Sequence, residues 1–159
     1  MSTKKATFGA GCFWGVEAAL SAIEGVTATA VGYEGGKMER PSYQDVCTDK
    51  TGHAEVVEVE FDPQRVSYDK LLDHFFALHD PTTKNRQGPD WGTQYRSAIF
   101  FHSPEQESEA RAKIEALTAE GRFRPRRIVT EVEPAGSFWR AEEYHQKYLE
   151  KRGQASCHI

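Results

Sequence analysis

The stretch from Gly9 to Leu20, "GAGCFWGVEAAL", contains the side chain best suited to covalent chemistry, the thiol of Cys12. Apolar residues recur after it at helical spacing, which predicts a helix that begins at or just after Cys12 and ends near Gly25. Unpaired amide groups and the positive end of the helix dipole favour the thiolate there, and the thiolate is the nucleophilic form. The alternative is a buried, unreactive thiol, because free cysteines often pack as small hydrophobes.

The neighbours of Cys12 indicate what could approach it. Gly9 and Gly11 would let a substrate come close to the backbone. Phe13 and Trp14 could form an apolar wall that receives a small group such as a methyl. The alternative for both aromatic residues is ordinary core packing.

Two long polar segments, residues 32–55 and 80–96, are rich in turn residues and longer than most connections in a compact domain, which favours a functional role. They contain Tyr43, Asp90 and Tyr95. Tyrosine hydroxyls could donate hydrogen bonds to a polarised oxygen, although each of these residues taken alone is more often structural.

Glu55 lies at the end of the first polar segment and at the start of an alternating run, "EVVEVEF". The run predicts a half-buried strand with Val57 and Val59 on one face. If Glu55 continues the face of Glu58 and Glu60, it faces solvent. A role as proton donor would require an apolar setting instead.

Helix signals are clear in two places. A helix is expected from Ser67, as N-cap, to just before Pro81. The second has Ser103 as N-cap, Pro104 in the first turn, Gln106 to complete a capping box and Gly121 after its end.

Strands are expected at residues 5–8, 27–33, 96–102 and 128–133, and a closing helix in residues 140–151. Strands and helices interleave, so the sequence predicts an α+β sandwich with helices packed on a mostly antiparallel sheet. The length of 159 residues predicts a single domain over residues 1–159.

Composition limits the partners and the compartment. Twenty basic and 24 acidic residues give a net charge of −4, which argues against nucleic acid. The chain shows neither a membrane span nor the apolar core of a signal peptide, so we expect no membrane association and a cytoplasmic location. An odd number of cysteines fits a reducing compartment. The histidines and cysteines lack metal-ligand spacing, so no metal is expected.

The last cysteine, Cys157, lies in a tail over residues 150–159 that we expect to be mobile. If Cys12 became a sulfenic acid, a thiol on such a tail could condense with it to a disulfide. Cys47 competes for this role, but its position in an ordered-looking segment favours a structural one.

Six blocks occur in order: "GCFWG", "GYEGG", "PSYQDVC", "TGHAEVV", "DPTTKNRQGPDWGTQYRSAIF" and "AEEYHQKYL". Together they make residues 8–149 closely resemble the A-type peptide methionine sulfoxide reductases. The resemblance implies a ferredoxin-like α/β sandwich wrapped by long loops. It also implies repair of oxidative damage, by reduction of the S epimer of methionine sulfoxide, free or in proteins, without a metal or bound cofactor.

The resemblance also implies roles for the candidate residues. Cys12 attacks the sulfoxide sulfur, and Glu55, placed at the floor of the pocket, protonates the oxygen. Tyr43 and Tyr95 match the tyrosines that hold this oxygen, and Asp90 matches an acidic residue of the same polar pocket. The solvent-facing interpretation of Glu55 gives way to the acid role.

The remaining implications concern specificity and recycling. Phe13 and Trp14 match the family's site for the substrate's methyl group. Since the tail has one cysteine, we expect a direct disulfide between Cys12 and Cys157 that thioredoxin reduces, in a monomeric protein.

Three other functions remain open from the sequence. A cysteine hydrolase would use His53 or His145 as the base for Cys12. A thiol peroxidase would share the sulfenic acid but would have no use for a methyl site. A binding module for segments that contain methionine would bind without turnover.

Overall fold

The computed structural model describes residues 3–146. The elements occur in this order: β1 (Lys4–Ala10), α1 (Phe13–Ser21), β2 (Val26–Glu34), α2 (Tyr43–Cys47), β3 (Ala54–Phe61), α3 (Tyr68–Ala77), β4 (Arg86–Gln87), β5 (Asp90–Trp91), the 3-10 turn η1 (Thr93–Tyr95), β6 (Ser97–Phe101), α4 (Pro104–Glu120), β7 (Glu131–Pro134), β8 (Trp139–Arg140) and the 3-10 turn η2 (Glu143–His145).

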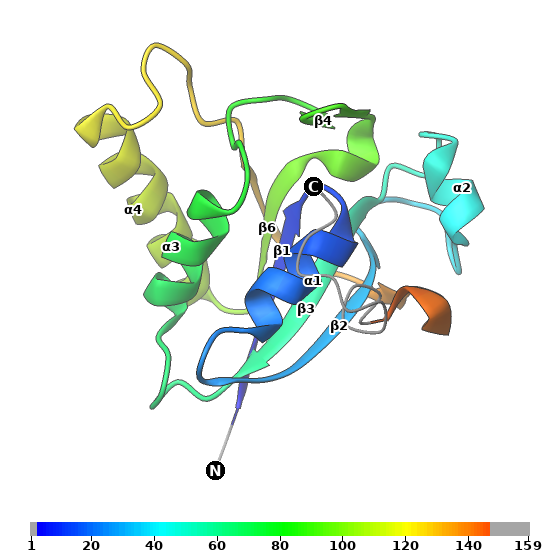
Figure 1. Ribbon diagram of the computed structural model, residues 1–159, viewed down its shortest axis with the longest axis horizontal. Coiled ribbons are helices and arrows are strands. Elements are labelled where there is room, and N and C mark those ends of the chain that lie inside the picture. Colours follow the sequence, from blue (N-terminus) through cyan, green and yellow to red (C-terminus); the bar gives the residue numbers. More distant parts are fainter. Residues whose placement is uncertain (1–2, 147–159) are drawn as a thin grey trace.

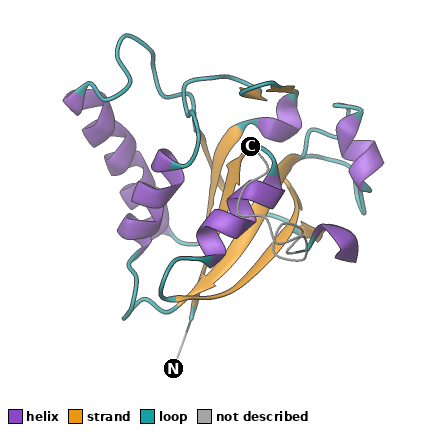
Figure 2. Cartoon of the chain, in the orientation of Figure 1, coloured by secondary structure: helices purple, strands orange, loops and turns teal. Residues whose placement is uncertain are grey.

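A six-stranded sheet organises these elements in the order β7-β6-β1-β3-β2-β8 (Figures 1 and 2). All of its neighbouring strands are antiparallel except β6 and β7, which α4 connects in parallel. The predicted α+β class with a mostly antiparallel sheet is confirmed.

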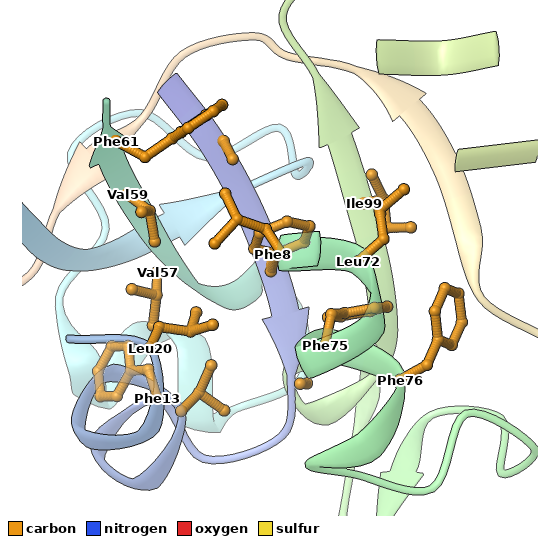
Figure 3. Packing of buried hydrophobic residues seen from close by; sticks show 14 of the residues in the cluster. Phe8, Phe13, Leu20, Val57, Val59, Phe61, Leu72, Phe75, Phe76 and Ile99 are labelled. Atoms are coloured by element: carbon orange, nitrogen blue, oxygen red, sulfur yellow. The ribbon is translucent and has the colours of Figure 1, made fainter. Parts of the chain in front are cut away.

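The main core lies between one face of this sheet and the helices α1, α3 and α4. Figure 3 shows Phe8 of β1 among side chains of neighbouring strands and of α3. The ring of Phe8 is fully buried, and its centroid lies 5.1 Å from that of Phe75. These contacts hold α3 on the sheet, and α1 packs in the same core through Phe13 and Leu20, directly after Cys12.

The opposite face of the sheet has a smaller core. Ala54, Val56, Ala98 and Phe100 pack there, and the chain just before β8 covers them with Phe138. The sheet is therefore covered on both faces, but helices cover only one of them.

The predicted helix ends agree closely with the structure. The Ser67 hydroxyl accepts a hydrogen bond from the Lys70 N–H, and Gly121 ends α4 in the left-handed conformation at φ 71°. The Ser103 hydroxyl accepts from the Gln106 N–H. The expected reciprocal bond is replaced, because the Gln106 side chain accepts from the His102 N–H and donates to the backbone of β1.

The predicted closing helix is wrong for residues 140–146, which form part of β8, a short connection and η2; residues 147–151 lie outside the described part of the chain. Tertiary hydrogen bonds explain the difference. The Ala141 N–H donates to the Val31 carbonyl, and the Gln146 side chain bonds to both the N–H and the carbonyl of Val31. The edge of β2 thus holds this segment against the sheet in place of a continuous helix.

The two long polar segments contain short regular elements that the sequence did not predict. The first contains α2, which begins with a capping box between Ser42 and Asp45. The second contains the β4–β5 hairpin and η1. The sequences of α2 and of the β4–β5 hairpin show no apolar periodicity from which these elements could have been predicted. Among residues 3–146, no helix combines the length and apolar character that crossing a membrane would require.

Candidate active site

Cys12 is the N-cap residue of α1, with φ −57° and ψ 120°, as the sequence predicts. Its carbonyl accepts the first helical hydrogen bond from Val16 at 3.4 Å. The side chain is half-buried, so the thiol combines access from solvent with the field of the helix start.

The glycines before Cys12 have a different role from the one predicted. Gly11 adopts φ 101°, and a β-carbon there would lie 2.7 Å from Cγ of Gln87. A β-carbon on Gly9 would lie 3.3 Å from the carbonyls of Arg96 and Glu55. Both glycines are buried. They make room for the protein's own chain rather than for a substrate.

Glu55 lies at the floor of the site, with a side chain that is 1% exposed. It is two residues before Val57 and therefore shares the helix-covered face of β3 with Val57 and Val59. Its Oε1 accepts a hydrogen bond from the Phe13 N–H at 3.2 Å, directly after Cys12. The solvent-facing interpretation is wrong, since it assigned Glu55 to the wrong face of an alternating strand.

Aromatic rings form one wall beside the thiol. The ring of Phe13 is buried and has its centroid 5.7 Å from Tyr33, 6.4 Å from Tyr43 and 5.3 Å from His145. Trp14 is half-buried and stacks on His145 at 5.6 Å. The arrangement forms an apolar surface next to Cys12.

His145 holds the indole of Trp14 in this wall. The Trp14 Nε1–H donates to His145 Nδ1 at 3.0 Å, so the proton of the neutral imidazole lies on Nε2. Burial lowers the pKa of His145 and outweighs the opposing charge of Glu142. The ring is therefore a neutral acceptor.

Glu142 connects two tyrosines of the site. One carboxylate oxygen accepts from the Tyr33 hydroxyl at 3.2 Å, and the other accepts from the Tyr43 N–H at 3.1 Å. Burial, followed by the nearby charge of Glu55, raises the pKa of Tyr43 far above its usual value. Tyr43 is thus a neutral donor.

Tyr95 lies where the candidate groups converge. Its pKa is raised to about 12, first by burial and then by the charges of Glu55, Cys47, Asp90 and Cys12. These contributions indicate that all four groups lie within electrostatic range of Tyr95. Together with the hydrogen bond from the Phe13 N–H to Glu55 and the ring contact between Phe13 and Tyr43, they define one candidate site.

The β4–β5 hairpin contributes Asp90, which is half-buried and pairs with Gln87. The adjacent Trp91 is 70% exposed, and the Arg86 guanidinium lies 4.6 Å from the centroid of its ring. Asp90 is thus a polar group of the site, whereas Trp91 lies on its exposed rim.

Cys47, the last residue of α2, lies nearer the site than the sequence indicated. Desolvation raises the pKa of its thiol, and the nearby charge of Glu55 adds to this shift. The structural role of Cys47 stays a prediction. Cys157 lies outside the described residues.

The histidines proposed as bases for a hydrolase have other partners. His53 Nδ1 accepts from the Gly36 N–H, and its Nε2 lies 2.6 Å from the Met38 carbonyl. His145 Nδ1 is occupied by Trp14. Both rings are therefore committed to structural contacts, which argues against the hydrolase.

Sequence reasoning missed the supporting residues Tyr33, Gln94, Glu142 and the role of His145. Two of them, Glu142 and His145, lie in the block "AEEYHQ", which the sequence assigned to a helix and which the structure shows as a short connection and η2. Among residues 3–146, no cluster of three or more His, Cys, Asp or Glu side chains could hold a metal ion.

Comparison with known proteins identifies the family. The family model described as peptide methionine sulfoxide reductase matches residues 4–159. A protein from Acidobacterium capsulatum named peptide methionine sulfoxide reductase MsrA is 68% identical over 155 residues, which cover 98% of this chain and 99% of that protein.

Solved structures agree with this assignment. Mxr1 from Saccharomyces cerevisiae in reduced form has a TM-score of 0.88 and 39% identity, over 96% of this chain and 87% of that one. Mxr1 in complex with Trx2 has a TM-score of 0.64 and 26% identity, over 92% and 84% of the two chains. The chain therefore belongs to the peptide methionine sulfoxide reductase family, in its A type.

Proposed function

We propose that this protein reduces the S epimer of methionine sulfoxide, free or in proteins, to methionine, and so repairs oxidative damage. The observation that carries the proposal is the buried Glu55 carboxyl, which accepts a hydrogen bond from the N–H of the residue after Cys12. A nucleophile and an acid side by side are what removal of a sulfoxide oxygen requires.

The first step transfers the substrate oxygen to Cys12. The Cys12 thiolate attacks the sulfoxide sulfur and forms a sulfur–sulfur bond, while the protonated Glu55 gives its proton to the oxygen, whose basicity rises during the attack. The resulting hydroxyl group then moves from the substrate sulfur to the Cys12 sulfur, so that the substrate's sulfur–oxygen bond and the new sulfur–sulfur bond both break. Cys12 becomes a sulfenic acid, and the substrate leaves as a thioether. Cys12 is oxidised by two electrons and methionine is the reduced product.

Two neutral tyrosines support this step. Because the pKa values of Tyr43 and Tyr95 are both raised, their hydroxyls remain donors and can hold the oxygen as negative charge develops on it. Asp90 completes the polar side of the pocket. Phe13 and Trp14 receive the methyl group.

The second step restores the thiol. The Cys157 thiol condenses with the Cys12 sulfenic acid, water leaves, and a disulfide forms. A thioredoxin then reduces this disulfide and becomes oxidised itself. The sequence position of Cys157 and the yeast Mxr1 complex with Trx2 support this part of the proposal.

The wider predictions belong to the same proposal. We infer one catalytic domain over residues 1–159 with a mobile tail at 150–159, acting as a monomer in the cytoplasm. We also infer a ferredoxin-like sandwich. Its support is the β1-α1-β2-β3-α3-β6 succession, whose strands lie in the antiparallel order β6-β1-β3-β2.

A single-turnover experiment tests the function. Fully reduced protein is mixed with the S epimer of a blocked methionine sulfoxide without reductant, methionine is quantified, and disulfides are mapped by peptide mass spectrometry. We expect at least one equivalent of methionine and a bond between Cys12 and Cys157. A bond between Cys12 and Cys47 would keep the function and replace the resolving thiol.

Two controls separate the other functions. The Cys12→Ser variant should form no methionine, and the R epimer should remain unreduced. Accumulation of an acyl-enzyme from an ester would indicate a hydrolase, and turnover of peroxide without turnover of sulfoxide would indicate a peroxidase. Substrate binding without any methionine would leave only a binding module.

A further inference from the structure

Asp49 joins the two short elements that carry the tyrosines of the site. We propose that Asp49 is a positioning residue that holds Tyr95 in its working place relative to Tyr43. The proposal rests on the proposed function, in which these two hydroxyls hold the sulfoxide oxygen.

The contact is a helix cap supplied from a distant part of the chain. The Asp49 carboxylate oxygen Oδ1 accepts a hydrogen bond from the Thr93 N–H at 2.8 Å and another from the Thr93 hydroxyl. Thr93 is the first residue of η1, and the N-cap residue of η1 is Gly92, which has no side chain. Asp49 therefore satisfies a backbone donor that η1 itself leaves open.

The backbone of Asp49 is bent to make this contact. Asp49 adopts φ 63°, in the left-handed region that residues other than glycine rarely occupy, and its N–H donates to the Val46 carbonyl at 3.0 Å. Such conformations persist where the surroundings hold them, and they are found more often at functional sites. A glycine would fit this backbone better, so the aspartate side chain is the feature to explain.

Thr93 passes the restraint to Tyr95. The Tyr95 N–H donates to the Gly92 carbonyl at 3.0 Å. The Thr93 carbonyl accepts from the Arg96 N–H at 3.2 Å and from the Arg96 guanidinium at 2.9 Å. Hydrogen bonds thus hold the chain on both sides of Tyr95, at Gly92 and at Arg96. A displacement of Thr93 would therefore also displace the Tyr95 hydroxyl.

The other end of the connection is α2. Tyr43 begins α2 and Cys47 ends it. Asp49 follows two residues later. Through its two hydrogen bonds to Thr93, Asp49 forms a clasp between the end of α2 and η1. A preorganised pair of donors is what stabilisation of a developing charge demands.

Substitution by glycine tests Asp49 without straining the backbone. Asp49→Gly removes the carboxylate and suits φ 63°, so the melting temperature Tm should stay within about 3 °C of wild type. We expect kcat/KM for the blocked sulfoxide to fall about 3-fold to 10-fold, the factor that corresponds to loss of one or two hydrogen bonds. Asp49→Asn keeps an acceptor oxygen and should recover most of the activity.

Two controls separate positioning from a general structural role. Arg40 also adopts a left-handed conformation, at φ 48°, in the same polar segment, and Arg40→Gly should retain wild-type kcat/KM. Amide hydrogen exchange of Thr93 should accelerate in Asp49→Gly and not in Arg40→Gly. A lowered Tm with unchanged kcat/KM would mean that Asp49 only stabilises the fold.

A double-mutant cycle with Tyr95→Phe decides the proposal. If Asp49 acts through Tyr95, the loss from Tyr95→Phe should be several-fold smaller in the Asp49→Gly background. Additive losses would overturn the clasp while leaving the oxygen site intact. Wild-type activity in Tyr95→Phe would show that Tyr95 does not hold the sulfoxide oxygen. Asp49 would then have no catalytic role through Tyr95.

Discussion

Glu34 and Glu55 are two buried carboxyls on neighbouring strands. Each side chain is 1% exposed, and each accepts a backbone N–H, from Gly136 for Glu34 and from Phe13 for Glu55. Their pairing partners differ by one residue, since Glu55 is opposite Tyr33 and Glu34 is opposite Ala54. That single step places them on opposite faces of the sheet.

The faces decide what each carboxyl can do. Glu55 lies beside the nucleophile and two neutral tyrosines, whereas Glu34 lies by the small core of Val56 and Phe100. Burial raises the pKa of Glu34 to about 7, against the opposing Gly136 N–H. A buried carboxyl with a raised pKa is therefore not by itself a catalytic acid, because catalysis also needs a reacting group within reach.

The largest expected effect follows removal of the proton donor. Glu55→Gln should lower turnover by about 10³-fold, within the range for general acid catalysis, because an amide cannot transfer the proton. The amide oxygen can still accept the Phe13 N–H, so substrate affinity and Tm should change little. Single-turnover methionine formation measures this, with Glu34→Gln as the matched control. Equal losses in the two variants would remove the distinction between the carboxyls.

Loss of one tyrosine hydroxyl should have the next largest effect. Tyr95→Phe should reduce the single-turnover rate by up to about 100-fold, as for the loss of one donor to a developing oxyanion. Since the pKa of Tyr95 is about 12, its hydroxyl stays protonated across the working range. The ratio of the wild-type and Tyr95→Phe rates should thus be constant up to about pH 10. A ratio that collapses near neutrality would show that Tyr95 ionises there.

Glu34→Gln should change stability and leave activity within about 2-fold of wild type. The folded-state pKa of Glu34 is raised from 4.5 to about 7, so its charged form is disfavoured in the folded protein. Its contribution to stability is fully present below pH 4.5 and is lost as the pH rises through 7.

The measurement is urea unfolding of both proteins at several pH values. Glu34→Gln should gain about 2 kcal/mol on wild type between pH 5 and pH 8. A parallel pH dependence in the two proteins would show that Glu34 keeps an ordinary pKa in the folded state.

The smallest expected effect concerns the apolar wall. His145→Phe removes the acceptor for the Trp14 indole N–H and should raise KM about 3-fold to 10-fold, with little change in kcat. His145→Asn places an amide oxygen near the position of Nδ1 and should recover the affinity. Equal KM values for both variants would mean that the hydrogen bond does not hold Trp14.

Acid should reproduce this loss in the wild type. The pKa of His145 is lowered, so the imidazole gains a proton on Nδ1 only at acidic pH, with Glu142 as the nearby charge that opposes the shift. We expect KM to rise in the wild type at a pH below the one at which an ordinary imidazole titrates, and not in His145→Asn. The indole N–H resonance of Trp14 should move over the same pH interval.

Local patterns predicted most of the regular structure. Ser67, Ser103 and Gly121 mark helix ends through contacts within a few residues, and those contacts form as expected. The short α2, the β4–β5 hairpin and the course of residues 140–146 were not predictable in this way. They depend on hydrogen bonds between distant segments, such as the one from Ala141 to Val31.

In the candidate site, too, some features follow from local sequence and others depend on contacts between distant segments. The sequence alone indicated that a helix begins at Cys12, through the apolar periodicity after it. It also fixed Phe13 and Trp14 next to Cys12, because they follow it directly along the chain. Only the tertiary structure decided that Glu55 reaches that helix start, and that Glu142, His145 and Asp49 support the side chains around it. Those contacts join segments that are 42 to 131 residues apart in the sequence. Local propensities act only between near neighbours in the chain, so these contacts form only once the sheet and the elements around it have packed together.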